Sequence, residues 1–575
     1  MRLISLKANK DSFKPVRFKN SIGLNFIVAT QKEENRQKGD TTNGVGKSLL
    51  IALIHFCLGA SKNEAFKNNL SDWIFTLEFS INDKIYISER STNSQEKIKL
   101  NGEEISSTDF NKKLGKLLFE IPNNVNQLSF RSLMPFFIRP RRASYSDYKN
   151  PNSVNNEFQI LVTNTFLLGI DVTLAQEKFK LRQDKERIRK LVKELKNDKL
   201  LKDFFTGEKD IALTEQDLSV QIENLENDLK NFDVADDYYE IKEQADKIKR
   251  VLEKIQNNII LFKNQIQNID ESRKISPDIK KENIERIYKE ASVIIKEDAL
   301  KQLSELEKFY EHISSNREKR LLQQKNEITR EIEKLTTVQE QKSRELDNKL
   351  KYLGAHKALD VFVKLTNKLS DLKNKKVNIT KYHSLLEEYR KEKIRIDEDF
   401  INATKKTDAY LQDAQDLIKT LNDFFRKLSK HFYPDVTSGI SIKNNDGDNQ
   451  TRYDFKAEIY ADASDGINNV KIFCYDLTLL IKGFGHKINT IFHDSRLLDG
   501  IDPLQKADMF IILNDLIKAS NKQYILSLNQ SQIDEFRKYL SEEQYNNIIQ
   551  DNIILQLKDN SDEEKLLGIK VDMHY

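Results

Sequence analysis

Apolar and polar residues alternate with a period of two in several short stretches near the start of the chain. Trp73–Ile81 and Lys84–Arg90 alternate on either side of Asn82-Asp83, which predicts a β-hairpin. A second tight turn is predicted at Asn101-Gly102. The other elements predicted here are the strands Met1–Asn9 and Val16–Ala29 and the helix Lys47–Leu58. Residues 1–170 are therefore expected to form one lobe of an α/β domain.

The pattern changes near residue 171, where apolar residues take up the heptad spacing of helices that pack side by side. Steps of four and three residues separate Leu218, Ile222, Leu225 and Leu229, then Ile328, Ile332 and Leu335, then Leu346, Leu350 and Leu353. A less regular centre contains Pro277. We therefore predict an antiparallel coiled coil over 171–430 with a turn near 271–300. Interruptions are predicted at 205–210 and 353–359, and a compact helical bundle is the alternative.

Strand-like segments return in residues 431–575. They are Thr451–Ala461, Thr490–Phe492, Gln523–Leu528, Ile553–Leu557 and Ile569–Val571. Neither α/β part is complete alone, and a coiled coil that leaves and returns would bring the two together. The predicted fold is therefore one α/β head assembled from an N-terminal and a C-terminal lobe, with the coiled coil inserted between them.

The composition agrees with a long helical insertion. Charged residues make up 32% of the 575, and there are only 8 prolines and 17 glycines, a mix that suits solvated helices better than several dense domains. The 94 basic residues nearly balance the 90 acidic ones, which gives a net charge of +4. A nucleic-acid partner must therefore be argued from a local basic cluster rather than from bulk charge.

Cysteine usage and the apolar runs favour a cytoplasmic protein without a membrane partner. Cys57 and Cys474 lie far apart and can form neither a disulfide framework nor a zinc site, which favours a reducing compartment. The N-terminal residues include no apolar leader, and no apolar run approaches the ~20 residues that span a bilayer.

The stretch 43-NGVGKS-48 predicts a phosphate-binding loop. It follows a predicted strand, opens a predicted helix and lacks only the first glycine of the usual pattern, where Thr41 stands. Backbone N–H groups and the helix N-terminus would face the phosphates, Lys47 would reach the β- and γ-phosphates, and the Ser48 hydroxyl would bind Mg²⁺. The residues assigned to nucleotide binding are Asn43, Gly44, Val45, Gly46, Lys47, Ser48 and Leu49.

Further motifs lie in the C-terminal lobe. The apolar strand 490-TIFHD-494 ends in Asp494, the residue type that holds magnesium at a strand end, and an ordinary helix cap is the alternative. Ser464 and Gly466 precede an apolar helix, a pattern that helix caps also produce. The strand Gln523–Leu528 is followed by Asn529, where either a γ-phosphate sensor or a plain strand end is expected.

The split head, the phosphate loop and the inserted coiled coil together resemble the SMC-type branch of ABC ATPases, which includes RecN and RecF. The resemblance is narrowed by 492-FHDSRLLDGID-502, 461-ADASDGINNVKIFCYDL-477, 309-FYEHISSNREKR-320, 129-SFRSLMPFFIR-139 and 566-LLGIK-570. These segments are similar to a family first catalogued only as a domain of unknown function. The resemblance identifies that family as the ATPase component of bacterial ABC three-component systems, associated with defence against phage and other foreign DNA.

This resemblance implies an ABC-type ATPase head that binds ATP and Mg²⁺, with Ser48 and Asp494 as the metal ligands. It also implies a homodimer through the heads. Lys47 and Ser48 of one head would face Ser464 and Gly466 of the other across the nucleotide.

The same resemblance raises a question about hydrolysis. In ABC ATPases a glutamate directly after the aspartate polarises the attacking water, whereas Ser495 stands in that place here. Serine is a poor base near pH 7 without an activator of its own. His493, Asp499 and Asp502 are the nearby candidates to replace the glutamate, and slow hydrolysis is the alternative.

A basic cluster in 139-RPRRASYSDYK-149 predicts a contact with double-stranded DNA. It consists of Arg139, Arg141, Arg142 and Lys149. Pro140 favours a loop, and arginines beside serine and tyrosine hydroxyls suit phosphate contacts without base reading. The alternative is that Arg139 or Arg131 serves the nucleotide pocket or packs under the coiled coil.

These observations favour an SMC-like ATPase that dimerises on ATP, binds or senses double-stranded DNA and licenses partner effector or regulatory subunits in defence. The sequence contains no nuclease constellation, so destructive chemistry would belong to a partner. A nucleotide-locked scaffold with negligible hydrolysis, a DNA-repair ATPase of RecN type and a structural coiled coil with a relic head are the alternatives.

Overall fold

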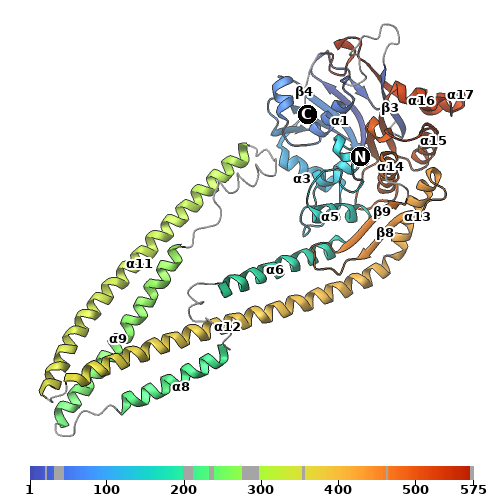
Figure 1. The fold of residues 1–575 in the computed structure, drawn as a ribbon. Coiled ribbons are helices and arrows are strands. Elements are labelled where there is room, and N and C mark those ends of the chain that lie inside the picture. The colour runs from blue at the N-terminus through green and yellow to red at the C-terminus, as the bar shows by residue number, and fades with distance from the viewer. Residues whose placement is uncertain are drawn as a thin grey trace. The chain divides into compact units, whose positions relative to one another are not determined.

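The computed structural model describes residues 1–19, 22–30, 44–197, 211–231, 239–274, 297–352, 356–460 and 464–569. The chain forms two compact units: Met1–Lys190 together with Glu392–Tyr575 (unit 1), and Leu191–Lys391 (unit 2). Figure 1 shows the β-strands in unit 1 and long helices in unit 2. The two ends of the chain therefore fold together as one α/β unit, as predicted.

A parallel sheet joins the two ends of the chain in unit 1. Its order is β10 (Thr490–His493), β11 (Gln523–Asn529), β3 (Gly23–Thr30) and β12 (Ile553–Lys558). Neighbouring strands are parallel throughout, and β3 is buried along nearly its whole length. Such burial explains why 24-LNFIVA-29 is almost continuously apolar, since parallel sheets are covered on both faces.

An antiparallel sheet forms the second layer. Its order is β2 (Val16–Arg17), β1 (Arg2–Ala8), β4 (Ile74–Ile81), β5 (Lys84–Ser91), β6 (Lys97–Leu100) and β7 (Glu103–Ser106). Asn82 and Asp83 both have positive φ angles, 49° and 62°, which the tight hairpin between β4 and β5 requires. Both turns predicted from the alternation of apolar residues are therefore confirmed.

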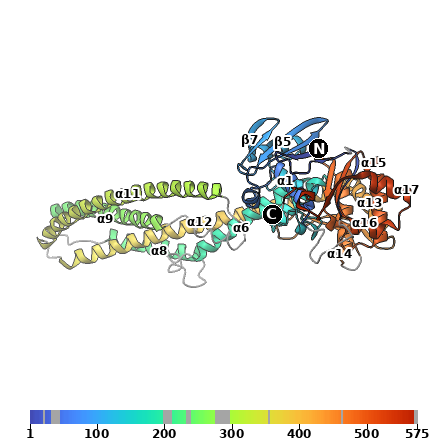
Figure 2. The same cartoon turned by 90° about the horizontal axis from the view of Figure 1, so that it is seen from above.

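Helices pack on both sheets of unit 1 (Figure 2). They are α1 (Lys47–Cys57), α2 (Glu64–Asn69), α3 (Ser107–Leu118), α4 (Phe130–Leu133), α5 (Glu157–Leu167), α13 (Gln415–Phe432), α14 (Asp465–Lys482), α15 (Pro503–Ala519), α16 (Gln530–Arg537) and α17 (Glu542–Gln544). Helix α1 packs on β4 and β5, whereas α15 and α16 pack on β3. One apolar core runs through both sheets and the helices of this list other than α17, which has no buried residue.

The predicted strand Val16–Ala29 corresponds to two strands, β2 and β3, which belong to different sheets. Two further predicted strands differ in extent from the observed structure. The segment Thr451–Ala461 contains β9 (Tyr453–Ile459), which pairs with β8 (Ser438–Asn444) in an antiparallel hairpin. Ile569 lies outside any strand, and the remaining residues of the predicted strand Ile569–Val571 fall outside the described part of the chain.

The heptad pattern gives long helices. They are α6 (Val172–Asn197), α8 (Ile211–Lys230), α9 (Tyr239–Lys274), α11 (Glu297–Tyr352) and α12 (His356–Asp413). On α8 the predicted apolar stripe is buried at Leu218, Ile222 and Leu229. The predicted breaks at 205–210 and around 353 lie largely outside the described residues.

The path of these helices differs from a pair of arms with one turn. Helix α9 packs antiparallel to α11, with Asp270 against Lys325 and Gln256 against Gln339. Helix α12 starts parallel to α9, since Gln256 bonds to Asn367, and then runs antiparallel to α8. The chain therefore reverses between α8 and α9 and between α11 and α12 as well as near 271–300. The expectation of a single reversal is wrong, because heptad spacing fixes which face of a helix packs but not which helix it packs against.

Both cysteines are buried and free, Cys57 in α1 and Cys474 in α14. Burial raises the pKa of the Cys57 thiol to about 12, so it is unreactive near neutral pH. Among the described helices, none has both the length and the apolar character needed to cross a bilayer.

The packing of α9 on α11 can be tested by cross-linking. In the variant Gln256→Cys/Gln339→Cys, a short bifunctional thiol reagent is expected to join the helices, because the two glutamines bond to each other across the interface. The matched control Gln256→Cys/Gln341→Cys places the second thiol about 200° around α11, on an exposed face. Equal cross-linking of both pairs, read as a mass shift after proteolysis, would contradict this packing.

Candidate functional site

The predicted phosphate loop lies between β3 and α1. Its last residues, Gly44 to Gly46, are described, whereas Asn43 and Thr41 fall outside the described part of the chain. Gly46 occupies the cap position of α1 with a φ angle of 107°, a conformation that side chains disfavour. Residues Lys47, Ser48 and Leu49 form the first turn of the helix, where backbone N–H groups point toward the N-terminal end.

A segment near the C-terminus, which contains Leu566, packs against the phosphate loop. The Leu566 N–H donates to the Val45 carbonyl at 3.0 Å, and the Lys14 N–H donates to the Leu566 carbonyl at 2.9 Å. A Cβ at Gly46 would lie 2.5 Å from the Cβ of Leu566, so the glycine is needed for space as well as for its φ angle. Leu566, the first residue of the motif 566-LLGIK-570, therefore contacts the phosphate loop directly.

Ser48 and Asp494 meet although 446 residues separate them in the sequence. The Ser48 hydroxyl donates to Asp494 Oδ2 at 2.7 Å. Strand β11 lies between β3 and β10, and the parallel register brings the carboxyl ends of these strands to one edge of the sheet. A serine hydroxyl beside a carboxylate is a donor set that suits Mg²⁺, so these residues fit the metal that the sequence predicts.

Lys47 lies beside this pair. Its side chain is almost fully buried, and burial lowers the pKa of the ammonium to about 8, an effect that the Asp494 charge opposes. A lysine side chain in the first turn of a helix adds its charge to the N-terminal end of the helix, where phosphate groups bind favourably. The first turn of α1 and the end of β10 thus form a site suited to a phosphate and a magnesium ion.

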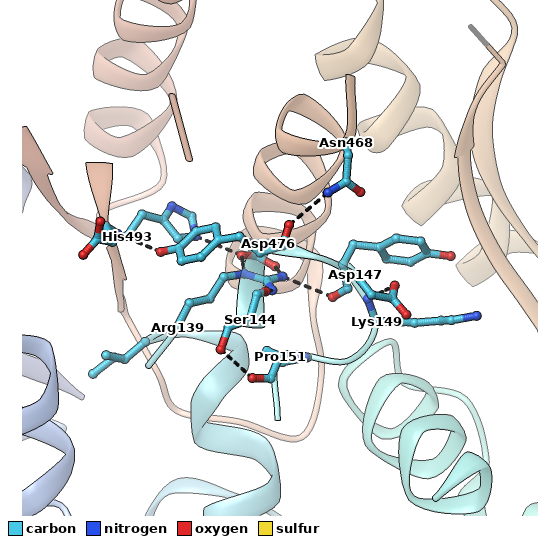
Figure 3. Close-up of polar contacts among 12 residues, drawn as sticks. Arg139, Ser144, Asp147, Lys149, Pro151, Asn468, Asp476 and His493 are labelled. Atoms are coloured by element: carbon cyan, nitrogen blue, oxygen red, sulfur yellow. Dashed lines mark hydrogen bonds and ion pairs between the residues drawn. The ribbon is translucent and has the colours of Figure 1, made fainter. Parts of the chain in front are cut away.

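Arg139, Asp476 and His493, the residue before Asp494, belong to a fully buried chain of polar contacts (Figure 3). The Arg139 guanidinium donates to both oxygens of Asp476, at 2.6 and 2.7 Å. Asp476 also bonds to His493 Nε2 at 2.8 Å, and His493 Nδ1 bonds to the Tyr524 hydroxyl at 2.8 Å. The Arg139 side chain additionally donates to the backbone carbonyls of Ser144 and Tyr148.

This chain corrects two predictions from the sequence. Arg139 is completely buried and paired with Asp476, so it makes no contact with nucleic acid. His493 is also completely buried, and its two ring nitrogens bond to Asp476 and Tyr524. It therefore does not replace the missing glutamate. Burial lowers the pKa of His493, although Asp476 opposes the shift.

The loop after Arg139 is fixed to the strand that carries Asp494. Ile138 pairs with Phe492 in a parallel bridge, and the Asp494 N–H donates to the Tyr145 hydroxyl at 2.7 Å. Between these two anchors, Arg141 and Arg142 are exposed, and Lys149 is half-buried after them. The exposed arginines of the predicted DNA contact therefore lie between two contacts, one to Phe492 of β10 and one to the Asp494 backbone.

Ser495 is buried and bonds to other protein groups. Its hydroxyl donates to Asp494 Oδ1 at 3.2 Å, and its N–H donates to the Ser527 hydroxyl at 3.1 Å. The residue in the place of the glutamate is thus held by protein groups. Asp502 is exposed and caps α15 by accepting the Leu504 N–H, and this role accounts for it without any part in hydrolysis.

Ser464 and Gly466 form the N-terminal end of α14. The Ser464 side chain accepts the Ile467 N–H at 3.3 Å, which is the cap alternative raised by the sequence. A Cβ at Gly466 would lie 2.3 Å from the Gly500 carbonyl oxygen, so the glycine allows α14 to pack against the loop after Asp494. Their contact with a nucleotide on a second head stays a prediction.

The sequence analysis missed Arg496 at the site and named Asn529 only as a possible γ-phosphate sensor or a plain strand end. Arg496 lies 3.9 Å from Asp494, measured between Nη1 and Oδ2. Asn529, at the end of β11, has a buried Oδ1 without a partner among the described residues, as a polar group waiting for water or ligand would have. An arginine two positions after the acidic residue was the signal available for Arg496. Asp499 lies nearby, and partial burial raises the pKa of its carboxyl.

Comparisons with known proteins give relatives without a described activity. Residues 428–571 match the family described as "Uncharacterised protein conserved in bacteria (DUF2326)". The "Uncharacterized protein YydD" of Bacillus subtilis (strain 168) is 22% identical over 547 residues, which cover 89% of this chain and 90% of that protein. A solved Smc head domain with a coiled coil and joint, derived from Pyrococcus yayanosii, is similar with a TM-score of 0.38 and 13% identity, covering 94% of each chain. We therefore base the functional assignment on the site geometry and the motifs.

Tyr145→Phe tests the bond that holds Asp494. The substitution leaves the buried Asp494 N–H without its acceptor, so the free energy of unfolding of unit 1 is expected to fall by about 1–3 kcal/mol. Trp73, the single tryptophan, reports this unit in a denaturant titration. The control Tyr86→Phe, on the other sheet, is expected to change stability by less than about 0.5 kcal/mol. Equal effects of the two would contradict the role given to Tyr145.

Leu566→Ala tests the support of the phosphate loop. We expect the ATP dissociation constant to rise about tenfold, equivalent to ~1.4 kcal/mol, because the loop loses the side chain against which Gly46 packs. Leu567→Ala removes the same atoms one residue later and serves as the control in calorimetry. If both variants weaken ATP binding equally, the loss reflects general destabilisation instead.

Proposed function

We propose that this protein binds ATP with Mg²⁺ in unit 1 and is an SMC-like ATPase. The observation that carries the proposal is the 2.7 Å bond between Ser48 and Asp494, which brings the phosphate loop and the acidic strand end together at a sheet edge. Lys47 would contact the β- and γ-phosphates, and Ser48 and Asp494 would hold the metal. Mg²⁺, when bound, would neutralise charge on the phosphates.

Nucleotide binding would drive association of two heads. Ser464 is exposed at the start of α14, where a phosphate held by a second copy could reach it. Gly466 is buried against Gly500, so its part in such an interface would be to set the position of the helix end. Head closure on ATP, and opening on hydrolysis or release, is the cycle that the resemblance to SMC-type proteins implies.

DNA would contact the loop that carries Arg141 and Arg142. Both side chains are exposed, and the anchors Arg139 and Tyr145 connect the loop to Asp476 and to the Asp494 backbone. Binding of the DNA phosphate backbone to this loop would therefore affect the positions of the residues proposed to hold the metal. Lys149 would add a further, weaker contact.

A nucleotide-locked scaffold is the second candidate function. It is favoured by Ser495, which stands in the place of the glutamate and is buried and bonded to Asp494 and Ser527. In this case ATP would close the heads and turnover would be negligible. The Arg139 anchor and the metal site would serve the closed state in either case.

The motifs that resemble the ATPase component of bacterial ABC three-component systems support a role in bacterial defence. A chain without its own nuclease constellation would signal to partner subunits that carry the effector chemistry. A DNA-repair role of RecN type would use the same head and coiled coil and differ in its partners.

ATP hydrolysis with and without linear double-stranded DNA separates these functions. For an active ATPase, DNA raises turnover, and Lys47→Ala or Asp494→Ala lowers it by about 10²-fold or more, since each removes a charge that faces the phosphates or the metal. A locked scaffold instead binds ATP tightly without turnover, and Ser495→Glu then tests whether a base alone restores it. Binding and turnover unaffected by Lys47→Ala would contradict the proposed site.

The double substitution Arg141→Gln/Arg142→Gln tests the DNA contact. DNA affinity is expected to fall uniformly across sequences, and the slope of log affinity against log salt to decrease by about 0.9 for each lost phosphate contact. Arg187→Gln/Arg189→Gln, two exposed arginines of α6, is the matched control. An equal loss in the control pair would show that the loop has no special part in DNA binding.

A further inference from the structure

Asp494 faces two cationic side chains from different elements. Its Oδ2 accepts the Ser48 hydroxyl at 2.7 Å and lies 3.9 Å from Arg496 Nη1. Arg496 belongs to the 3₁₀ turn Ser495–Leu498 that follows β10, whereas Lys47 comes from α1. Burial is the main cause of the lowered pKa of Lys47, and the positive charge of Arg496 contributes to it.

The backbone of Arg496 is held by two hydrogen bonds, whereas its guanidinium is partly exposed to solvent. The Arg496 N–H donates to Asp494 Oδ1 at 3.2 Å, and its carbonyl accepts the Asn469 amide of α14 at 3.2 Å. The side chain itself is 37% exposed, and its 3.9 Å separation from Asp494 is longer than a hydrogen bond. Such a side chain can turn to another anion without disturbing the turn that carries it.

Binding of a metal at Asp494 would weaken the electrostatic attraction between the Asp494 carboxylate and the Arg496 guanidinium. Ser48 and Asp494 would hold a divalent cation, whose charge would compensate the carboxylate and disfavour a guanidinium at the same oxygen. The nearest new anion would be the terminal phosphate that Lys47 and the metal hold in the proposed site. A guanidinium matches phosphate oxygens in a forked geometry that lysine cannot reproduce.

Resting on the proposed ATP site, we propose that Arg496 turns from Asp494 to the γ-phosphate and is a catalytic residue for phosphoryl transfer. In that reaction a water oxygen forms a bond to the γ-phosphorus, and the bond from this phosphorus to the β–γ bridging oxygen breaks. The electron pair leaves on ADP, and the protons of the water pass to phosphate and solvent. Arg496 stabilises the negative charge on the transferred group, so it aids turnover without acting as the base.

This role explains how a site with a buried serine in place of glutamate could still favour hydrolysis. Loss of an arginine that stabilises transferred phosphoryl charge costs about 10³–10⁵ in rate in well-studied phosphoryl transfer. The proposed role of Arg496 also predicts an effect on nucleotide binding, because ADP lacks the γ-phosphate that Arg496 would contact. Discrimination between ATP and ADP should therefore depend on Arg496.

The experiment measures calorimetric affinities of the full chain for Mg²⁺ with AMP-PNP, a non-hydrolysable ATP analogue, and for Mg²⁺ with ADP. Arg496→Gln is expected to weaken AMP-PNP binding about tenfold and ADP binding less than about threefold, with Arg496→Lys intermediate. Arg537→Gln, an exposed arginine of α16, serves as the matched control and leaves both affinities unchanged. Equal changes for the two nucleotides, or none, would overturn the role of Arg496.

Lys47→Ala separates this inference from the proposed function. If Lys47→Ala leaves AMP-PNP binding intact, the nucleotide site itself is wrong. If Lys47→Ala abolishes binding while Arg496→Gln keeps the ratio of the two affinities, the site stands and only the role of Arg496 fails. Unfolding monitored by Trp73 fluorescence confirms that each variant is folded before its affinity is compared.

Discussion

The buried ion pair between Arg139 and Asp476 is the interaction on which the site depends. It joins the segment that follows α4, the helix α14 and, through His493, the strand β10. Both side chains are completely buried, so breaking the pair would leave an uncompensated charge at a cost of about 3–5 kcal/mol. The pair survives burial because two carbonyls and a histidine complete its hydrogen bonds.

Three parts of the site take their positions from this pair. Arg139 fixes the start of the loop whose Tyr145 holds the Asp494 backbone. Asp476 fixes the middle of α14, whose first turns hold the loop after Asp494 through Asn469. His55 of α1 contacts the Ile138 carbonyl at 2.8 Å, so the phosphate-loop helix is tied to the same segment. A change at the exposed arginines of the loop could therefore reach the metal ligands through rigid, buried contacts.

Local patterns predicted most elements but not how distant parts meet. The Asn82-Asp83 hairpin, the helix after 43-NGVGKS-48 and the strand that ends at Asp494 follow from spacing and turn chemistry. Arg139 was misassigned because a run of arginines around Pro140 is also typical of a surface loop, and its partner lies 337 residues away. His493 was misassigned because its position beside Asp494 does not show that both of its ring nitrogens bond to the buried Asp476 and Tyr524. The reversals of the coiled coil depend on which helices pack together, which heptad spacing does not specify. A role for Arg496 follows only from the contact between Ser48 and Asp494, which are far apart in the sequence.

The central claim is that the two ends of the chain build one metal and nucleotide site. A double-mutant cycle with Ser48→Ala and Asp494→Asn, measuring the Mg²⁺-dependent part of AMP-PNP affinity, tests it directly. If both residues hold one ion, each single substitution removes most of the metal dependence and the double variant loses little more. Losses that add in full would mean that the two residues act independently, and would contradict a shared site.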